Sequence, residues 1–407
     1  ISGLENPIYA LAGVALLALA LDRPLEGGQR VRTAVGAGIS AAALALTRPE
    51  GIVFSALWPL VAAPGVIRAR GASRLPKLRE MGRLVAAYAA AFALPVLAYL
   101  LFRRLYFGDW VPNTYYAKGG PTLTGLSGIL SLGPATARRG VELLQAAAGS
   151  LGSWLALGLF AATVYLLARR RLSREVALLC SASVAGALPY LLLPLDWMPE
   201  FRFATLFFAL APAAGVAVVA ALPLGRRFQW ALGLAVASSL VISAAPRIRT
   251  FAAHPTVPFA EVEARYGQDY NRYAAALGVD HGSFLLPDVG GALWTSHLRI
   301  YDLGGLCDRK LAHGIRFDRK ELHEHVFGTL QPTFVRVHHY WAVRAQFDLD
   351  PRFARDYVPL WSIVDPWVQK RANATVPIRT GEYVRREIAE RNPRVLEKLR
   401  REISAAR

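Results

Sequence analysis

Eight apolar segments dominate the first 245 residues and constrain the fold more than any other feature of the sequence. A bilayer core about 30 Å thick takes roughly 20 apolar residues per helix, and somewhat fewer where flanking side chains snorkel to the surface. The segments that approach this length are 7–21, 33–46, 52–67, 84–102, 151–168, 176–193, 203–222 and 228–245. We therefore predict that residues 1–245 form an α-helical multi-pass membrane domain of about eight transmembrane helices in a lipid bilayer.

Composition and charge agree with this prediction. Of the 407 residues, 54% are hydrophobic and 19% are charged, which is too apolar for an ordinary soluble domain of this size. A net charge of +18 is also found in nucleic-acid-binding proteins, but here the basic residues gather in turns that follow every second apolar segment. Short cytoplasmic loops of membrane proteins collect Lys and Arg in this way. The charge therefore indicates orientation, and no nucleic-acid partner is expected.

The four basic turns orient the chain. They contain Arg23, Arg30 and Arg32; Arg68, Arg70, Arg74, Lys77, Arg79 and Arg83; Arg169, Arg170, Arg171 and Arg174; and Arg226 and Arg227. If these turns are cytoplasmic, the turn 47–51, the segments 103–150 and 194–202 and everything after Pro246 lie on the outer side. We expect a multi-pass protein of the bacterial cytoplasmic (inner) membrane, with its C-terminal domain outside.

Residues 246–407 have a different character, with charges throughout and no segment long enough to span a bilayer. Strands alternate with helices, which predicts a small α/β extracytoplasmic domain. The expected strands are 283–286, 299–301 and 333–337; the expected helices are 259–277, 319–327 and a charged terminal helix over 382–407 that is interrupted at Pro393.

Three polar clusters lie at the outer ends of the apolar segments. They comprise Arg48 and Glu50; Asp109, Asn113, Tyr116 and Lys118; and Asp196, Trp197, Glu200 and Arg202. Charged groups at a membrane edge are costly unless they are paired, so such clusters are candidates for function. The alternative is that the aromatic and arginine side chains only anchor the protein among the lipid headgroups. Aromatic rings beside carboxylates and basic groups suit a sugar held next to a phosphate.

The opening Ser2-Gly3-Leu4-Glu5-Asn6-Pro7, the turn Thr47-Arg48-Pro49-Glu50-Gly51, the segment from Tyr106 to Lys118 and the segment from Asp196 to Phe203 together resemble a bacterial group of GT-C membrane glycosyltransferases. The group is similar to the terminal arabinofuranosyltransferases of the mycobacterial cell wall. Two later turns, Asp288-Val289-Gly290-Gly291 and Asp302-Leu303-Gly304-Gly305-Leu306, resemble strand ends in the outer domain of that group. The resemblance covers nearly the whole chain.

The resemblance implies an inverting glycosyltransferase that moves a sugar from a polyprenyl-phosphate donor to a cell-envelope glycan or lipid acceptor on the outer face of the membrane. Arg48, Lys118 and Arg202 would hold the donor's phosphate; Glu50, Asp109, Asp196 and Glu200 would bind sugar hydroxyls or order the site. The catalytic Asp of GT-C enzymes lies between the first two transmembrane helices, so we expect it before Ile1, in a part that this N-terminally truncated sequence lacks. No cofactor is assigned, and a divalent cation is left open.

The alternative is a non-enzymatic polytopic protein for lipid-linked glycan transport or envelope assembly. Transport requires ionisable groups along a path through the membrane, whereas the charges here lie at the ends of the apolar segments. This pattern favours catalysis at one face. Histidine pairs at 323/325 and 338/339 lack the spacing of a helical zinc site, and the turn 287–291 is interpreted as structural or as part of an acceptor-facing rim.

Overall fold

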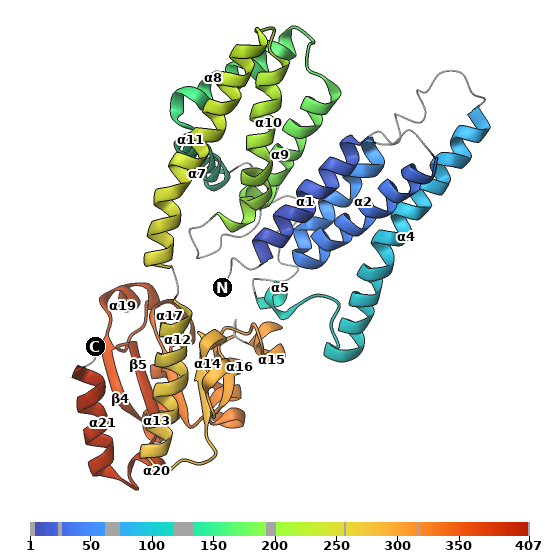
Figure 1. Cartoon of the computed structure of the whole chain (residues 1–407). Helices are drawn as coiled ribbons and strands as arrows, with labels where there is room; N and C mark the ends of the chain where they lie inside the picture. The colour runs from blue at the N-terminus through green and yellow to red at the C-terminus, as the bar shows by residue number, and fades with distance from the viewer. Residues whose placement is uncertain are drawn as a thin grey trace. The chain divides into compact units, whose positions relative to one another are not determined.

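The computed structural model describes residues 5–22, 27–61, 74–117, 133–192, 201–255, 258–315 and 318–405. The chain forms two compact units (Figure 1). The helical unit comprises Ile1–Trp110 and Ile129–Thr256, and the sheet unit comprises Val111–Gly128 and Val257–Arg407. A short stretch that follows α4 (Arg74–Phe107) in sequence therefore belongs to the same unit as the C-terminal third of the chain.

The helical unit is built from long apolar helices. Its elements are α1 (Glu5–Leu21), α2 (Gly27–Thr47), η1 (Pro49–Ala56), α4, α7 (Pro134–Leu151), α8 (Ser153–Ala168), α9 (Arg174–Leu192), η3 (Arg202–Ala204), α10 (Thr205–Ala221) and α11 (Arg226–Ala253). Helices α1, α2 and α4 pack side by side, as do α9 and α10 (Figure 1). Many large apolar side chains on α4, α8 and α11 are exposed, as expected for helices that face lipid.

Four helices among the described residues are long and apolar enough to cross a membrane: Leu78–Phe107, Arg174–Leu192, Arg202–Ala221 and Arg226–Ala253. A fifth is added if the pair Thr136–Leu151 and Ser153–Ala168, which is bent by 108° at Gly152, forms one broken span. Helix α1 and the helix Pro49–Val61 are apolar but shorter. The third apolar segment opens as a 3-10 helix rather than an α-helix, and residues 62–67 of it lie outside the described residues.

Helix α11 continues through Pro246, where the sequence predicts the domain boundary. A proline removes one backbone hydrogen bond from a helix, and contacts with neighbouring elements compensate for the loss. Residues on both sides of Pro246 are tied to the end of α7. Ser243 donates to the carbonyl oxygen of Ser150 at 2.5 Å, and Arg247 donates to the Ser150 hydroxyl at 2.9 Å. The helix therefore ends at Ala253, and the sheet unit resumes at Val257.

Close packing of α2 against α4 depends on Gly38. A Cβ atom at this position would lie 2.5 Å from the carbonyl oxygen of Tyr88 and 2.8 Å from the Cβ of Ala91. In a membrane, lipid is as apolar as leucine, so helices associate through such close approaches of small residues. Gly38 thus permits the close approach of α2 and α4 at the middle of α2.

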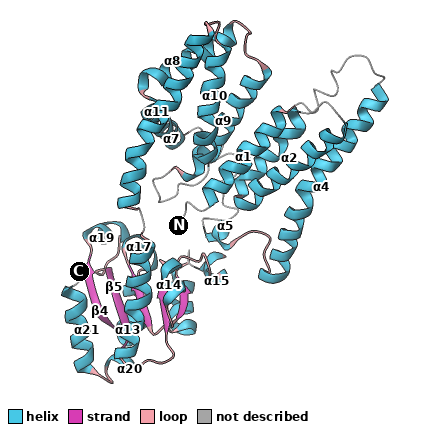
Figure 2. Ribbon diagram, viewed as in Figure 1, coloured by secondary structure: helices cyan, strands magenta, loops and turns pink. Residues whose placement is uncertain are grey.

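The sheet unit has five strands in the order β2-β1-β3-β5-β4 (Figure 2). They are β1 (Ser283–Leu286), β2 (Arg299–Asp302), β3 (Phe334–Val337), β4 (Tyr357–Val364) and β5 (Arg379–Arg385). Strands β2, β1 and β3 are parallel, and β5 is antiparallel to both β3 and β4. The three strands expected from sequence are present within one or two residues of their predicted bounds.

Helices cover both faces of this sheet, because alternate strand residues bury apolar side chains on opposite sides. Phe284, Leu286 and Phe334 pack in one core, whereas Leu285 and Val335 pack in the other. The first core also contains residues of α12 (Phe259–Glu263), η4 (Ala264–Gln268), α13 (Asp269–Ala276), α14 (Val289–Thr295) and α21 (Pro393–Ala405). The second contains residues of α15 (Arg309–Ala312), α16 (Arg319–His323), η6 (Glu324–Leu330), α17 (His339–Ala345), α18 (Pro351–Asp356) and α19 (Pro366–Ala372).

The prediction of a terminal helix from Glu382 is wrong at its start. Glu382 lies in β5, and the terminal helix α21 begins at Pro393, a residue that suits the first helical position. The charges of β5 suggest a helix, but Glu382 is 1% exposed and faces Arg336 of β3 across the sheet. Glu382 is neutralised by a residue of a neighbouring strand. The sequence around Glu382 alone therefore does not show that it belongs to a strand.

Candidate functional site

The turn after α2 directs the Arg48 side chain into the helical unit. Arg48 has an extended backbone, Pro49 opens the following 3-10 helix, and the Gly51 amide donates to the Arg48 carbonyl oxygen at 2.8 Å. A Cβ atom at Gly51 would lie 2.3 Å from the carbonyl oxygen of Leu44, so only glycine permits so tight a return. The Arg48 side chain is consequently 5% exposed although it follows the end of a helix.

Arg48 joins three segments that are far apart in sequence. Its Nε donates to Glu50 Oε1 at 2.6 Å, and its Nη1 donates both to Asn6 Oδ1 at 3.0 Å and to the carbonyl oxygen of Arg202 at 2.7 Å. Asn6 lies in the first turn of α1, and Arg202 opens η3 before α10. A polar cluster therefore lies at one end of α1, α2 and α10. We call Asn6, Arg48, Glu50, Arg202 and Phe203 the Arg48 cluster.

Two guanidinium groups share one aromatic ring in this cluster. The Arg48 Cζ lies 4.8 Å from the centroid of Phe203, and the Arg202 Cζ lies 5.3 Å from the same centroid. Cations near the face of an aromatic ring are attracted by its quadrupole. Glu50 is the carboxylate paired with Arg48. Among the described residues, the Arg48 cluster thus places two arginines and one carboxylate around one aromatic ring.

The structure brings together three of the ten predicted site residues: Arg48, Glu50 and Arg202. Asp109 is buried after the end of α4, and among the described residues it is not a contact of Arg48. Lys118, Asp196, Trp197 and Glu200 lie outside the described residues. The participation of Asn6 and Phe203 was not predicted, although both belong to the motifs that carry the resemblance.

Asn113 and Tyr116 belong to the sheet unit, on the short helix α5 (Asn113–Ala117). The Tyr116 ring stacks on the imidazole of His313 with centroids 3.9 Å apart, next to α15. This contact packs α5 against the end of α15 within the sheet unit. The sequence suggested that Tyr116 could anchor the protein among lipid headgroups. The structure supports a different role, in which Tyr116 packs within the sheet unit.

The sheet unit contains an acid–imidazole pair that the sequence did not predict. Asp288 follows β1 and His338 follows β3, and His338 Nε2 lies 2.6 Å from Asp288 Oδ2. Strand β2 lies on one side of β1 and β3 lies on the other. The loops that follow β1 and β3 therefore flank the point where the strand order reverses. In sheets of this kind ligands bind outside the carboxyl ends of the strands at that point.

Two further residues at the carboxyl ends of these strands, His339 and Asp302, are held by hydrogen bonds or ion pairs. His339 has a left-handed backbone with φ of 43°, and its Nδ1 lies 3.3 Å from Asp365 Oδ2. Asp302, at the end of β2, accepts hydrogen bonds from the amides of Gly304 and Cys307 at 2.8 and 2.7 Å. Burial raises the pKa of Asp302, and these backbone donors oppose the shift. Strained and buried polar residues of this kind gather at functional sites.

The histidines of α16 and η6 serve the core rather than a metal. His323 Nε2 donates to the carbonyl oxygen of Ala345 at 2.7 Å, and its Nδ1 lies 3.4 Å from Asp350. In the part of the chain that the structure describes, no three His, Cys, Asp or Glu side chains are grouped to hold a metal ion.

The sheet unit is expected to lose stability as the pH falls below about 6.5, the ordinary pKa of histidine. Burial lowers the pKa of both His323 and His325 in the folded protein. The unfolded chain therefore binds more protons, so stability is complete above pH 6.5 and decreases by up to about 1.4 kcal/mol per pH unit per histidine below it. Hydrogen exchange of β3 and β5 amides at pH 7.5 and 5.5, corrected for intrinsic rates, measures the loss.

The variant His323→Gln keeps a donor for Ala345 and removes one titrating group, so it should respond less to pH than the wild type. Equal pH responses of the two proteins would contradict the assignment to His323.

Comparison of the chain with protein families, with curated proteins and with solved structures finds no match.

Proposed function

We propose that the chain is a membrane glycosyltransferase of GT-C type that moves a sugar from a polyprenyl-phosphate donor to a cell-envelope glycan or lipid acceptor. The observation that carries the proposal is the Arg48 cluster, in which the buried Arg48 joins the ends of three helices beside a second arginine, Arg202. A phosphate joined to a lipid tail would meet a positive group at the edge of apolar helices.

The contacts of Arg48 suggest which residues of the cluster have a structural role and which bind the substrate. Its Nε and Nη1 already donate to protein acceptors, so Arg48 is best suited to positioning Glu50 and the Arg202 backbone. In this proposal Arg202 contacts the donor's phosphate, and Glu50 binds a sugar hydroxyl. Asp109, Asp196 and Glu200 would complete the site.

The proposal includes about eight spans, with the Arg48 cluster and the sheet unit on the outer side of the cytoplasmic membrane. The basic turns of the sequence support this orientation. Asp288 and His338, at the carboxyl edge of the parallel strands, are suited to bind hydroxyl groups of the acceptor.

The test uses membranes that contain the complete protein, incubated with a panel of polyprenyl-phosphate sugars. We expect transfer from at least one donor, and a reduction of about tenfold or more in Arg202→Ala and in Asp196→Ala, because a hydrogen bond to a charged group contributes about 1.5–3 kcal/mol. Membrane insertion should be unchanged in both variants.

The matched control is Arg401→Ala, which removes an arginine that is 81% exposed on α21. Its transfer rate should equal that of the wild type. Wild-type turnover in both Arg202→Ala and Asp196→Ala would refute the site, and inactivity with every donor would favour the assembly-scaffold alternative.

A further inference from the structure

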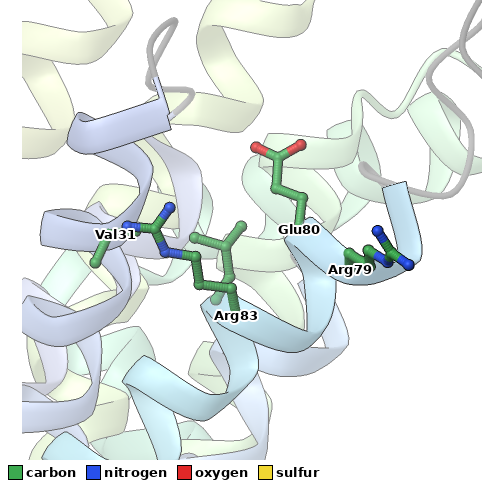
Figure 3. Close-up of a pocket in the computed structure, with 5 residues that line it drawn as sticks. Val31, Arg79, Glu80 and Arg83 are labelled. Carbon is green, nitrogen blue, oxygen red and sulfur yellow. The ribbon is translucent and has the colours of Figure 1, made fainter. Parts of the chain in front are cut away.

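A pocket of about 330 Å³ lies between the beginnings of α2 and α4, at the opposite end of α2 from the Arg48 cluster. Val31 of α2 and Arg79, Glu80, Arg83 and Leu84 of α4 line it. Figure 3 shows the Arg83 side chain extending from α4 toward Val31. The volume is within the range of small-ligand sites in proteins.

The pocket has a net positive charge that its own carboxylate does not cancel. Glu80 Oε1 is 2.7 Å from Arg30 Nη1, so this carboxylate is already neutralised by an arginine of α2. Across the described ranges, Arg79 and Arg83 have neither an ion pair nor a hydrogen bond, and both side chains are exposed. Two arginines that line one pocket with no protein acceptor provide several donors for an anion.

The position of the pocket indicates where such an anion comes from. Arg79 and Arg83 lie in the first turns of the candidate span Leu78–Phe107. In a helix that crosses a bilayer, basic side chains near the helix end extend toward the lipid headgroups. Val31 and Leu84 add apolar atoms to the lining of the pocket. A phosphate that enters from the headgroup layer can contact the guanidinium groups, while the adjoining glycerol and acyl carbons contact Val31 and Leu84.

We propose that this pocket binds the phosphate-bearing headgroup of an anionic phospholipid. The site is independent of the glycosyltransferase proposal, because it uses none of the residues of the Arg48 cluster. Phosphate free in solution presents the same chemistry but lacks the apolar part, so the pocket should bind it more weakly.

The test uses the complete protein in a nonionic detergent, titrated with phosphatidylglycerol and followed by native mass spectrometry of the lipid-bound protein. Each basic residue near an anionic lipid contributes about a fivefold gain in affinity, so Arg79→Gln/Arg83→Gln should weaken the tightest phosphatidylglycerol site by roughly 20–30-fold. Glu80→Gln should strengthen it, because it removes an anion from the pocket. Because Glu80→Gln should raise the affinity for phosphatidylglycerol, it tests the proposal even if the double variant folds poorly.

The matched control is Arg169→Gln/Arg171→Gln, which removes the same charge from the exposed turn after α8. This control should keep the wild-type affinity, and phosphatidylcholine should bind no more weakly to the pocket variant than to the wild type. Three results would each overturn the proposal: an equal loss in the control, wild-type affinity in the pocket variant, or inorganic phosphate that displaces phosphatidylglycerol at equal concentration.

Discussion

Arg48→Met is expected to lower the free energy of unfolding of the helical unit by about 3–5 kcal/mol, the usual cost of removing one member of a buried ion pair. The guanidinium is 5% exposed and supplies donors to Glu50, to Asn6 and to the carbonyl oxygen of Arg202. Methionine fills part of the same volume but provides no donor, so three acceptors at the ends of three segments lose their partner together. Denaturant unfolding of the purified protein in detergent measures the change.

The control for this substitution is Arg138→Met. Arg138 also pairs with a glutamate, Glu142, at 2.9 Å, but its side chain is 82% exposed. An exposed pair of this kind contributes at most about 1 kcal/mol. A loss of less than 1 kcal/mol in Arg48→Met would mean that the cluster does not join the three segments energetically.

The second large effect is expected in the sheet unit, where Arg336→Met should cost about 3–5 kcal/mol. Arg336 of β3 faces Glu382 of β5, and the side chains of the two residues are 6% and 2% exposed. Arg336 Nη2 also donates to the Tyr266 hydroxyl at 3.1 Å, and its guanidinium lies 4.4 Å from the Tyr266 ring centroid. The substitution removes the cation that neutralises Glu382 within the core beneath η4 and α13. Hydrogen exchange of β3 and β5 amides locates the loss in this unit.

The double variant Arg336→Met/Glu382→Leu separates charge from packing. Replacing both members of a buried pair by apolar residues is often neutral or stabilising, so most of the lost stability should return. A double variant as unstable as Arg336→Met would show that the tyrosine contact, rather than the ion pair, holds the strands together.

The sequence predicts those elements of the fold that depend mainly on their own residues. Strands β1, β2 and β3 are short segments with adjacent apolar or aromatic residues, and they occur where the sequence predicts them. Strand β5 was not predicted, because Glu382 is acceptable in a core only when Arg336 of β3 lies beside it. Strand β4 was not predicted either. Likewise, Pro246 marks a break in sequence, yet α11 continues through it, and Ser243 and Arg247 on either side of it bind Ser150.

The same distinction applies to the site. The positions of Arg48, Glu50 and Arg202 at the ends of apolar segments predicted that they would meet, and they do. The direction of the Arg48 donors was not predictable, since it depends on a carbonyl oxygen 154 residues away in the chain. The pair of Asp288 and His338 depends on strand order in the same way.

The two outer strands of the sheet limit how the protein can aggregate. An unpaired strand edge can template the addition of a strand from another molecule. Strand β2 offers only Arg299–Asp302 for such pairing, with an exposed arginine at its start. Strand β4 contains Pro359, which has no amide hydrogen to donate, next to an irregularity between Pro359 and Trp361. Both edges are thus unfavourable templates for the addition of a strand from another copy of the chain.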